Sequence, residues 1–236
     1  MSNLHENSGM RFNPEIPEFE ECPIKFNKRK QMWYRPGTFD LSSIKECYDN
    51  YSCIPVEGKT VLDLGANIGG FAKMCLNAGA KKIISVEPCP YNFQILELNA
   101  PDTVCINAAV CEEDQKEVTF HYAKSKRNSV SSSTVKRRNA SSVSISVPGL
   151  SFSKLLEKYR PEILKIDIEG KEYDILDSIE KIPSFVEVVG IEFHNLRSPF
   201  NQYPDLFFPE EEWKKVEHPI LMYGTKKVLD YTFFRR

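Results

Sequence analysis

The sequence VLDLGANIGGFAKMCLNAG, residues 61–79, decides the fold. It begins with a short apolar run typical of a buried strand, and this run ends at Gly65. The remainder predicts a helix that ends at Gly79. A second apolar run, KKIISVEP at residues 81–88, follows. Strand, glycine-rich turn, helix and strand in this order predict a βαβ unit with two parallel strands.

The same alternation continues along the rest of the chain. It predicts an α/β fold, with a mostly parallel sheet covered by helices on both faces. Helices are expected at residues 38–50, 90–100, 151–159, 171–179 and 209–216. Further strands are expected at residues 102–110, 118–123, 141–147, 162–170 and 185–195. Residues 219–223 and 227–234 flank Gly224-Thr225, so we expect an antiparallel hairpin to close the sheet.

The length of 236 residues suggests one main domain. Prolines interrupt the polar residues 1–31, which predicts an irregular arm. Asp40 is a candidate N-cap for the helix that follows the arm. We therefore expect an N-terminal arm and cap helix over residues 1–50 and an α/β domain over residues 51–236.

Composition excludes several classes of protein. Hydrophobic residues are 41% and charged residues 27% of the chain, as in ordinary globular proteins, and the net charge of −2 gives no overall attraction for nucleic acid. The seven cysteines include no CxxC pair, which argues against zinc and for free thiols in a reducing compartment. Without a signal-peptide pattern or a membrane-spanning apolar run, we expect a cytoplasmic protein with no membrane partner.

A basic, serine-rich insert occupies residues 124–146 and contains no acidic residue. An exposed loop is expected, because runs of charge are usually solvated. The alternative is a surface for nucleic acid, whose phosphates basic side chains neutralise. The basic residues concerned are Lys124, Lys126, Arg127, Lys136, Arg137 and Arg138.

The turn at residues 65–70 and the strand ends beside it suit a nucleoside ligand. Glycines in such a turn let a ligand approach the backbone closely. Asp63 suits a cationic group, and Glu87, at the end of the second strand, can accept both hydroxyls of a ribose. The GxGxxG dinucleotide fingerprint and the P-loop pattern are both missing. A site that suits a ribose and a positive charge, and that lacks a phosphate-binding loop, indicates S-adenosylmethionine (SAM) as the ligand. The alternative is a simple tight turn beside a solvated carboxylate.

Charged residues interrupt the expected strand within LKIDIEG, residues 164–170. A strand buried on both faces should be apolar, whereas Lys165, Asp167 and Glu169 alternate along one face of this one. Ligands bind at the carboxyl ends of strands in such sheets, so these residues are candidates for catalysis. The alternative is structural: Lys165 pairs with Asp167, and Glu169 lies in the first turn of the next helix.

The next expected strand ends in GIEFHN, residues 190–195, and places Glu192 and His194 on one face. Together with Asp167 and Glu169, these side chains could surround one cleft. Such a group suits a general base that takes a proton from a hydroxyl, and equally a divalent cation that lowers the pKa of that hydroxyl. A purely structural role for His194 is the alternative.

Five motifs resemble the FkbM family of SAM-dependent methyltransferases, over about residues 33–200. They are RPGTFD at residues 35–40, VLDLGANIGG at residues 61–70, Glu87-Pro88, NAAV at residues 107–110 and LKIDIEGKE at residues 164–172. The resemblance implies a class I methyltransferase fold. This fold is a Rossmann-like, mostly parallel sheet of seven strands with helices on both faces and the last strand antiparallel.

The resemblance also implies roles for individual residues. The cofactor SAM would be bound by Asp63, Gly65, Asn67, Gly69, Glu87, Ala108 and Arg35. The methyl-transfer site would contain Asp167 and Glu169, to which the strand ends add Glu192 and His194. The expected reaction is O-methylation of a sugar, glycan or small metabolite, with Asp167 or His194 removing the hydroxyl proton. The alternatives are methylation of a ribose 2′-hydroxyl in nucleic acid bound by the insert, and SAM binding without catalysis.

Overall fold

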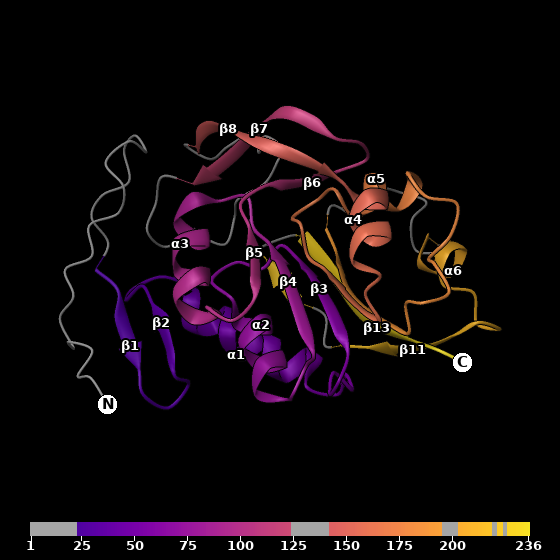
Figure 1. The fold of residues 1–236 in the computed structure, drawn as a ribbon, viewed down its shortest axis with the longest axis horizontal. Coiled ribbons are helices and arrows are strands. Elements are labelled where there is room, and N and C mark those ends of the chain that lie inside the picture. Colours follow the sequence, from indigo (N-terminus) through magenta and orange to yellow (C-terminus); the bar gives the residue numbers. More distant parts are fainter. Residues whose placement is uncertain (1–22, 124–141, 195–202, 219–220, 224–225) are drawn as a thin grey trace.

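The computed structural model describes residues 23–123, 142–194, 203–218, 221–223 and 226–236. An eight-stranded sheet occupies the centre of the molecule (Figure 1). One part of it is parallel, in the order β10 (Val188–Phe193), β9 (Ile163–Ile166), β3 (Thr60–Leu64), β4 (Lys82–Val86) and β5 (Val104–Ile106). The other part is antiparallel: β13 (Lys226–Arg235) pairs with β10, and β13 also pairs with β11 (Trp213–Glu217) and β12 (Leu221–Tyr223).

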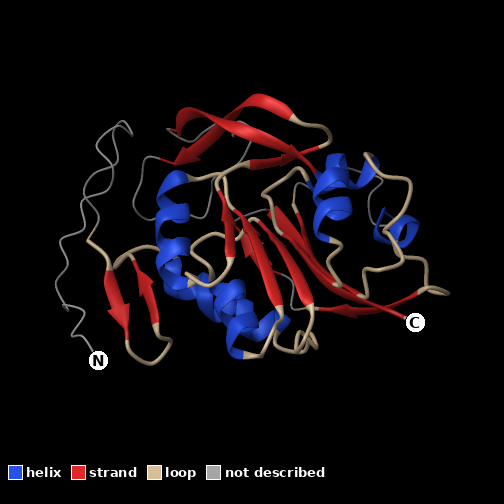
Figure 2. Ribbon diagram, in the orientation of Figure 1, coloured by secondary structure: helices blue, strands red, loops and turns tan. Residues whose placement is uncertain are grey.

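Helices lie against both faces of this sheet (Figure 2). One face carries α1 (Asp40–Tyr51), α2 (Gly70–Asn77) and α3 (Pro90–Asn99). The other carries α4 (Phe152–Tyr159), α5 (Glu172–Asp177) and α6 (Tyr203–Phe207). In the described part of the chain, no helix combines the length and apolar character needed to cross a membrane.

Alternation along the strands divides the core between the two layers of helices. Val61 and Ile163 pack on the side of α2, whereas Leu62 and Leu164 pack on the side of α4. The predicted mostly parallel sheet, with helices on both faces and a closing antiparallel hairpin, is therefore confirmed. The sheet has eight strands rather than seven, because β12 adds to the antiparallel edge.

A separate three-stranded sheet lies at one end of the molecule, at the top in Figure 1. It contains β6 (Ala109–Cys111), β7 (Gln115–Ala123) and β8 (Ser142–Ser151), in the order β6-β8-β7. The prediction of one strand over residues 102–110 is wrong, since β5 and β6 belong to different sheets. The amide of Asn107 donates hydrogen bonds to the backbone oxygens of Glu87 (2.8 Å) and Pro88 (3.1 Å), and this fixes the bend between the two strands.

The predicted helix at residues 209–216 is also wrong, because β11 occupies most of it. Trp213 is buried, packs edge-on against Phe208, and lies under the guanidinium of Arg235, 4.2 Å from its ring centroid. Pairing with β13 and this tertiary packing outweigh the local helical preference of the acidic and basic residues.

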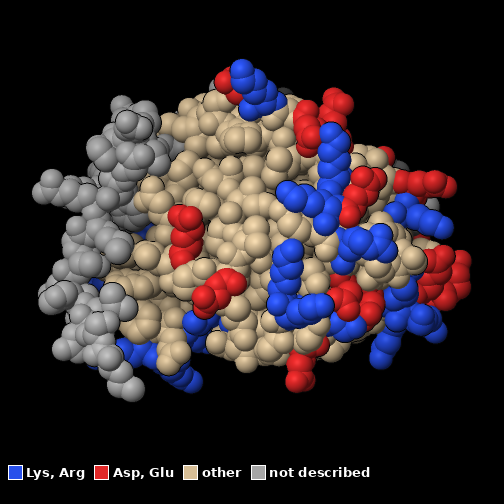
Figure 3. Space-filling model, viewed as in Figure 1, with Lys and Arg blue, Asp and Glu red and all other residues tan. Residues whose placement is uncertain are grey.

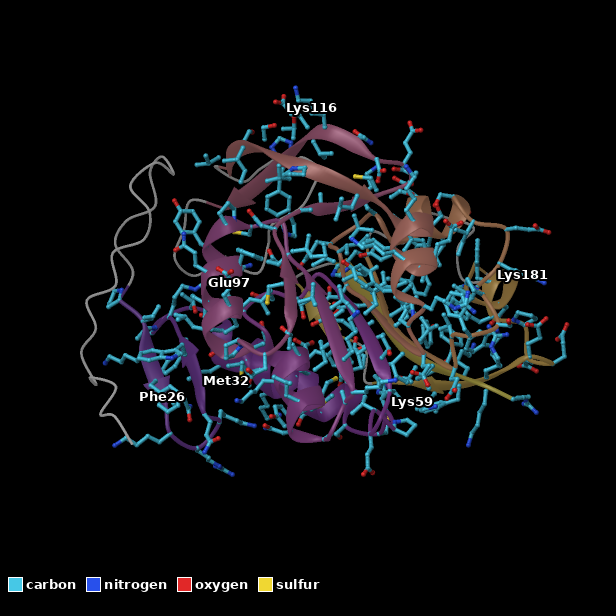
Figure 4. All side chains as sticks on the ribbon, in the orientation of Figure 1. Phe26, Met32, Lys59, Glu97, Lys116 and Lys181 are labelled. Atoms are coloured by element: carbon cyan, nitrogen blue, oxygen red, sulfur yellow. The ribbon has the colours of Figure 1, made fainter. Side chains whose placement is uncertain are left out.

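At the N-terminus, β1 (Lys25–Asn27) and β2 (Met32–Tyr34) form a hairpin where an irregular arm was expected. Met32 is fully buried against α1 and α3, whereas Phe26 is 46% exposed (Figure 4). Helix α1 lies where it was predicted, but Asp40 is not its N-cap. Its carboxylate pairs with Arg35 instead.

Candidate active site

The turn after β3 depends on glycine. Gly65 has a φ of +77°, and a Cβ at this position would lie 1.7 Å from the backbone oxygen of Asp167. Gly69 (φ +86°) and Asn67 (φ 52°) also adopt left-handed conformations. Since only glycine fits at position 65, the ends of β3 and β9 come into direct contact there. The predicted cofactor turn and the predicted catalytic strand therefore adjoin.

Glu87 follows β4 and is buried, with 5% of its surface exposed. Its Oε2 accepts a hydrogen bond from the backbone N–H of Asn67 (2.8 Å), and its Oε1 accepts one from the N–H of Cys89 (2.8 Å). Burial raises the pKa of Glu87 to about 7, although these two hydrogen bonds oppose the rise. Each carboxylate oxygen can accept a second hydrogen bond, so the group can still bind hydroxyls. Glu87 also fixes the backbone of the glycine-rich turn.

Asp63 is fully buried beneath this turn. Its two oxygens lack a hydrogen-bond partner among the described residues, and the Nζ of Lys165 lies 3.5 Å from Oδ1. Burial raises the pKa of Asp63 to about 6, against the influence of this lysine. Lys165 Nζ also donates to the backbone oxygen of Gly65 (2.9 Å) and lies 3.2 Å from Asp167 Oδ2. Lys165 thus links the cofactor turn to the end of β9, in agreement with the structural alternative for this residue.

The structure brings Asp167, Glu192 and His194 together, with one ligand atom from each lying within 4.8 Å of the others. The sheet register accounts for this, since Ile191 of β10 pairs with Ile166 of β9 and each strand then continues with a carboxylate. Asp167 is 29% exposed on its side chain, whereas Glu192 is 10% exposed. Asp167 is therefore the carboxylate of this pair that a substrate can reach more easily.

His194 lies among carboxylates. Its Nδ1 is 3.0 Å from Glu172 Oε1, and its Nε2 is 3.3 Å from Glu192 Oε1 and 3.6 Å from Glu169 Oε2. Burial alone would lower the pKa of His194, but the surrounding carboxylates outweigh burial and raise the pKa well above its ordinary value. The carboxylates therefore favour the protonated imidazole, which makes His194 the poorer proton acceptor in this arrangement. Of the two predicted bases, Asp167 suits that role better.

Three acidic residues of the site were not predicted from the sequence, namely Glu172, Glu46 and Asp230. Glu172 begins α5 and is fully buried, and it belongs to the LKIDIEGKE motif but was taken only as a helical residue. Glu46, on α1, has a pKa raised to about 7 by burial, with Glu192 and Asp167 adding to the rise. Asp230 lies opposite Glu192 in the register of β13 and β10. Asp230 can be recognised as a residue of the site only once the pairing of β13 with β10 is known.

Asp230 is held by α1. Asn50 Nδ2 donates to Asp230 Oδ2 (2.6 Å), and the Tyr51 hydroxyl donates to Oδ1 (3.1 Å). Burial raises the pKa of Asp230 to about 8, and Glu192 adds to the rise. Helix α1 is therefore part of the wall of the site as well as a cap over the sheet.

Arg35 is buried, with 1% of its surface exposed. Its Nη2 donates to Asp40 Oδ1 (2.8 Å) and to Asn92 Oδ1 (2.8 Å), and the amide of Asn92 lies 3.4 Å from Glu87 Oε1. Arg35 thus connects α1, α3 and the ribose candidate Glu87, and its predicted contact with the cofactor stays a prediction.

Two other predictions concern residues around this site. Ala108 is 1% exposed and follows Asn107, which bonds to the backbone of Glu87, so it lies near the strand end that carries Glu87. The basic side chains predicted to bind nucleic acid lie at residues 124–138, outside the described residues. On the face drawn in Figure 3, acidic and basic side chains are interspersed.

A model of the methyltransferase FkbM domain matches residues 63–223, more than half of the chain. The chain belongs to the FkbM methyltransferase family. This confirms the resemblance drawn from the motifs and makes the chain a SAM-dependent methyltransferase. No relative among curated proteins matches it.

Solved methyltransferase structures share a distant likeness with this FkbM protein. An rRNA methylase from Streptococcus thermophilus has 10% identity and a TM-score of 0.47, with 86% of this chain and 99% of that chain covered. M. jannaschii TYW2, in complex with AdoMet, has 15% identity and a TM-score of 0.46, with 92% and 84% covered. A precorrin-6y C5,15-methyltransferase from Geobacter metallireducens has 10% identity and a TM-score of 0.45, with 83% and 87% covered. Similarity at this level does not identify an acceptor.

The cofactor turn of this FkbM protein fits SAM. The Asp63 oxygens and Asn67 Oδ1 are buried and without hydrogen-bond partners in the described part of the chain. Buried polar atoms of this kind are rare in folded proteins unless a ligand or water binds them. All of them are acceptors, and the ammonium group of SAM supplies donors. Glu87 adds carboxylate acceptors at the neighbouring strand end.

Proposed function

We propose that this FkbM methyltransferase methylates a hydroxyl oxygen of a neutral acceptor, namely a sugar, a glycan or a small hydroxylated metabolite. The observation that carries the proposal is the group Asp167, Glu192 and His194 at the end of the strands, beside the cofactor turn. A hydroxyl must lose its proton to become methylated, and a carboxylate that contacts it can accept this proton.

In the proposed reaction, Asp63 and Asn67 bind the amino-acid part of SAM, and Glu87 binds its ribose. SAM supplies an electrophilic methyl group on a sulfonium. As the acceptor oxygen bonds to the methyl carbon, the bond from that carbon to the sulfonium sulfur breaks and S-adenosylhomocysteine leaves, while Asp167 accepts the proton of the acceptor hydroxyl. The positive charge held at His194 stabilises the negative charge that develops on the acceptor oxygen while its proton leaves. Lys165 fixes the position of Asp167 through their 3.2 Å ion pair.

The charges around the site support a neutral acceptor over a nucleic acid. Asp167 and Glu192 lie close to Glu169, which is 3.6 Å from His194. Carboxylates at this density repel phosphates, which a nucleic-acid substrate would bring close to the reacting hydroxyl. Methylation of nucleic acid through the basic insert is therefore the outcome that would count against the proposal.

The test is the Asp167→Asn variant, assayed with labelled SAM against a panel of sugars, glycans and small polyols. Loss of a general base typically lowers the rate about 10²–10⁴-fold. We expect this fall in kcat, with SAM affinity close to that of the wild type. The matched control is Asp102→Asn, which removes an exposed carboxylate before β5 and should leave both quantities unchanged. Wild-type turnover in Asp167→Asn would reject Asp167 as the base.

A further inference from the structure

We propose that Asp167, Glu192 and His194 form a binding site for one divalent transition-metal ion. Each residue offers one ligand atom, and these atoms lie within 4.8 Å of one another at the ends of β9 and β10. Two carboxylates and one imidazole make a mixed oxygen and nitrogen set. Imidazole suits zinc and other transition metals, and carboxylate suits Mn²⁺, so Mn²⁺ and Zn²⁺ fit this set better than Ca²⁺.

The orientation of His194 supports metal binding independently of the carboxylates. Its Nδ1 lies 3.0 Å from Oε1 of the fully buried Glu172. This Oε1 also accepts hydrogen bonds from the backbone N–H groups of Gly170 (3.0 Å) and Ile168 (3.3 Å). Glu172 is therefore fixed as an acceptor, and when a metal ion displaces the Nε2 proton, Glu172 keeps the remaining imidazole proton on Nδ1. Nε2 then faces the other two ligands, as in the carboxylate–histidine–metal arrangement of known metal sites.

The charges around these three residues also favour the binding of a metal ion. Glu46 on α1 and Asp230 on β13 also lie close enough to Glu192 to interact with it electrostatically. Lys165 already contacts Asp63, Asp167 and the backbone of Gly65, which leaves it little capacity for further carboxylates. Carboxyl groups buried together either keep their protons, as the raised pKa values of Glu46 and Asp230 indicate, or ionise beside a cation that compensates their charge. A divalent cation in place of the Nε2 proton of His194 adds one net positive charge at the centre of this group.

Asp167 gives the ion an open side. Its side chain is 29% exposed, whereas those of Glu192 and His194 are 10% and 9% exposed. Two ligands would thus come from the wall of the site and one from its rim, so that solvent or an acceptor oxygen can complete the coordination. If the proposed function holds, a hydroxyl bound there becomes more acidic, because a bound metal lowers the pKa of a coordinated oxygen.

The test is a titration of the full-length, chelator-treated protein with MnCl₂ alone, followed by the loss of the free Mn²⁺ signal in electron paramagnetic resonance. We expect one Mn²⁺ per chain. Glu192→Gln and His194→Ala should each abolish stoichiometric binding. Glu172→Gln, which leaves all three ligands in place, should weaken it about 10- to 100-fold. The matched control is His121→Ala, because His121 lies on β7, outside the cluster, and contacts Ser144 instead.

Circular dichroism identifies any variant that does not fold, and Asp167→Asn provides a further ligand variant at a more exposed position. Failure of the folded wild type to bind Mn²⁺ or Zn²⁺ at millimolar concentration would overturn the proposal. Unchanged binding in two folded ligand variants would do the same. Because the titration contains neither SAM nor acceptor, its result is independent of the proposed methylation. A protein that binds the ion but methylates no hydroxyl would reject the proposed function alone.

Discussion

Lys165 provides the buried positive charge between the cofactor turn and the catalytic strand, and Lys165→Met removes it. Its side chain is 4% exposed and pairs with two carboxylates, those of Asp63 and Asp167. The side chain of Asp63 has no exposed surface. Removing one partner from a buried ion pair typically costs about 3–5 kcal/mol, because the other charge stays buried and unpaired. We expect a loss of stability of about this size at neutral pH.

The loss should depend on pH. Since burial already raises the pKa of Asp63 to about 6 in the wild type, removal of Lys165 should raise it further. A protonated Asp63 needs no cation, so the difference between variant and wild type should shrink as the pH falls below this value. Urea denaturation of both proteins on either side of the pKa measures the two differences in unfolding free energy.

Lys59→Met is the matched control. Lys59 lies next to β3 at the opposite end of the strand and pairs with Glu162 (3.1 Å) and Glu187 (2.9 Å). Its side chain is 30% exposed, and ion pairs open to solvent contribute little to stability. If Lys165→Met cost no more than Lys59→Met, or if its cost were the same at both pH values, the reasoning about the buried network would be refuted.

Three further predictions concern the same region. Asp63 and Asp230 have raised pKa values in the folded chain, about 6 and about 8, so they keep protons that the unfolded chain releases. The melting temperature should therefore fall as the pH rises from about 5 to 9. A melting temperature that increases over this range would contradict the prediction. Glu87→Ala should weaken SAM binding in calorimetry about 10- to 150-fold, as expected for lost hydrogen bonds to a charged group, and unchanged affinity in a folded variant would remove Glu87 from the site. Gly65→Ala should abolish folding or greatly lower the melting temperature, because its Cβ would lie 1.7 Å from the backbone oxygen of Asp167. Gly58→Ala is the control, since Gly58 has a similar φ and open space around it, and it should lower the melting temperature far less. Equal losses in the two variants would show that the close contact at Gly65 is unimportant.

The sequence predicted the parallel part of the sheet well, because buried strands and helices have distinct periodicities there. The turn at Gly65 and the strand-end residue Glu87 follow directly from that pattern. The bend at Asn107 could not be predicted, since it depends on hydrogen bonds to Glu87 and Pro88, which precede it by nearly 20 residues. The strand at Trp213 depends on the partner strand β13, so its local composition suggested a helix instead.

The site residues at the ends of parallel strands were predicted from the sequence. The site residues that come from other elements were not. Asp167 and His194 lie close together because the carboxyl ends of parallel strands meet at one edge of the sheet. Asp230 joins them through antiparallel pairing with Glu192, which no local pattern encodes. The burial of Arg35 could not be predicted, because it depends on Asp40 and Asn92, and Asn92 is 57 residues away.

The identity of the methylated atom tests the central claim most directly. The wild type and Asp167→Asn would be incubated with ¹³C-methyl SAM and hydroxylated acceptors, with RNA as a competing acceptor, and the products analysed by mass spectrometry and NMR. Our account predicts a methyl ether on a neutral acceptor, formed by the wild type and nearly absent with Asp167→Asn. A methyl group on nitrogen or carbon, or methylated RNA formed equally well by both proteins, would contradict it.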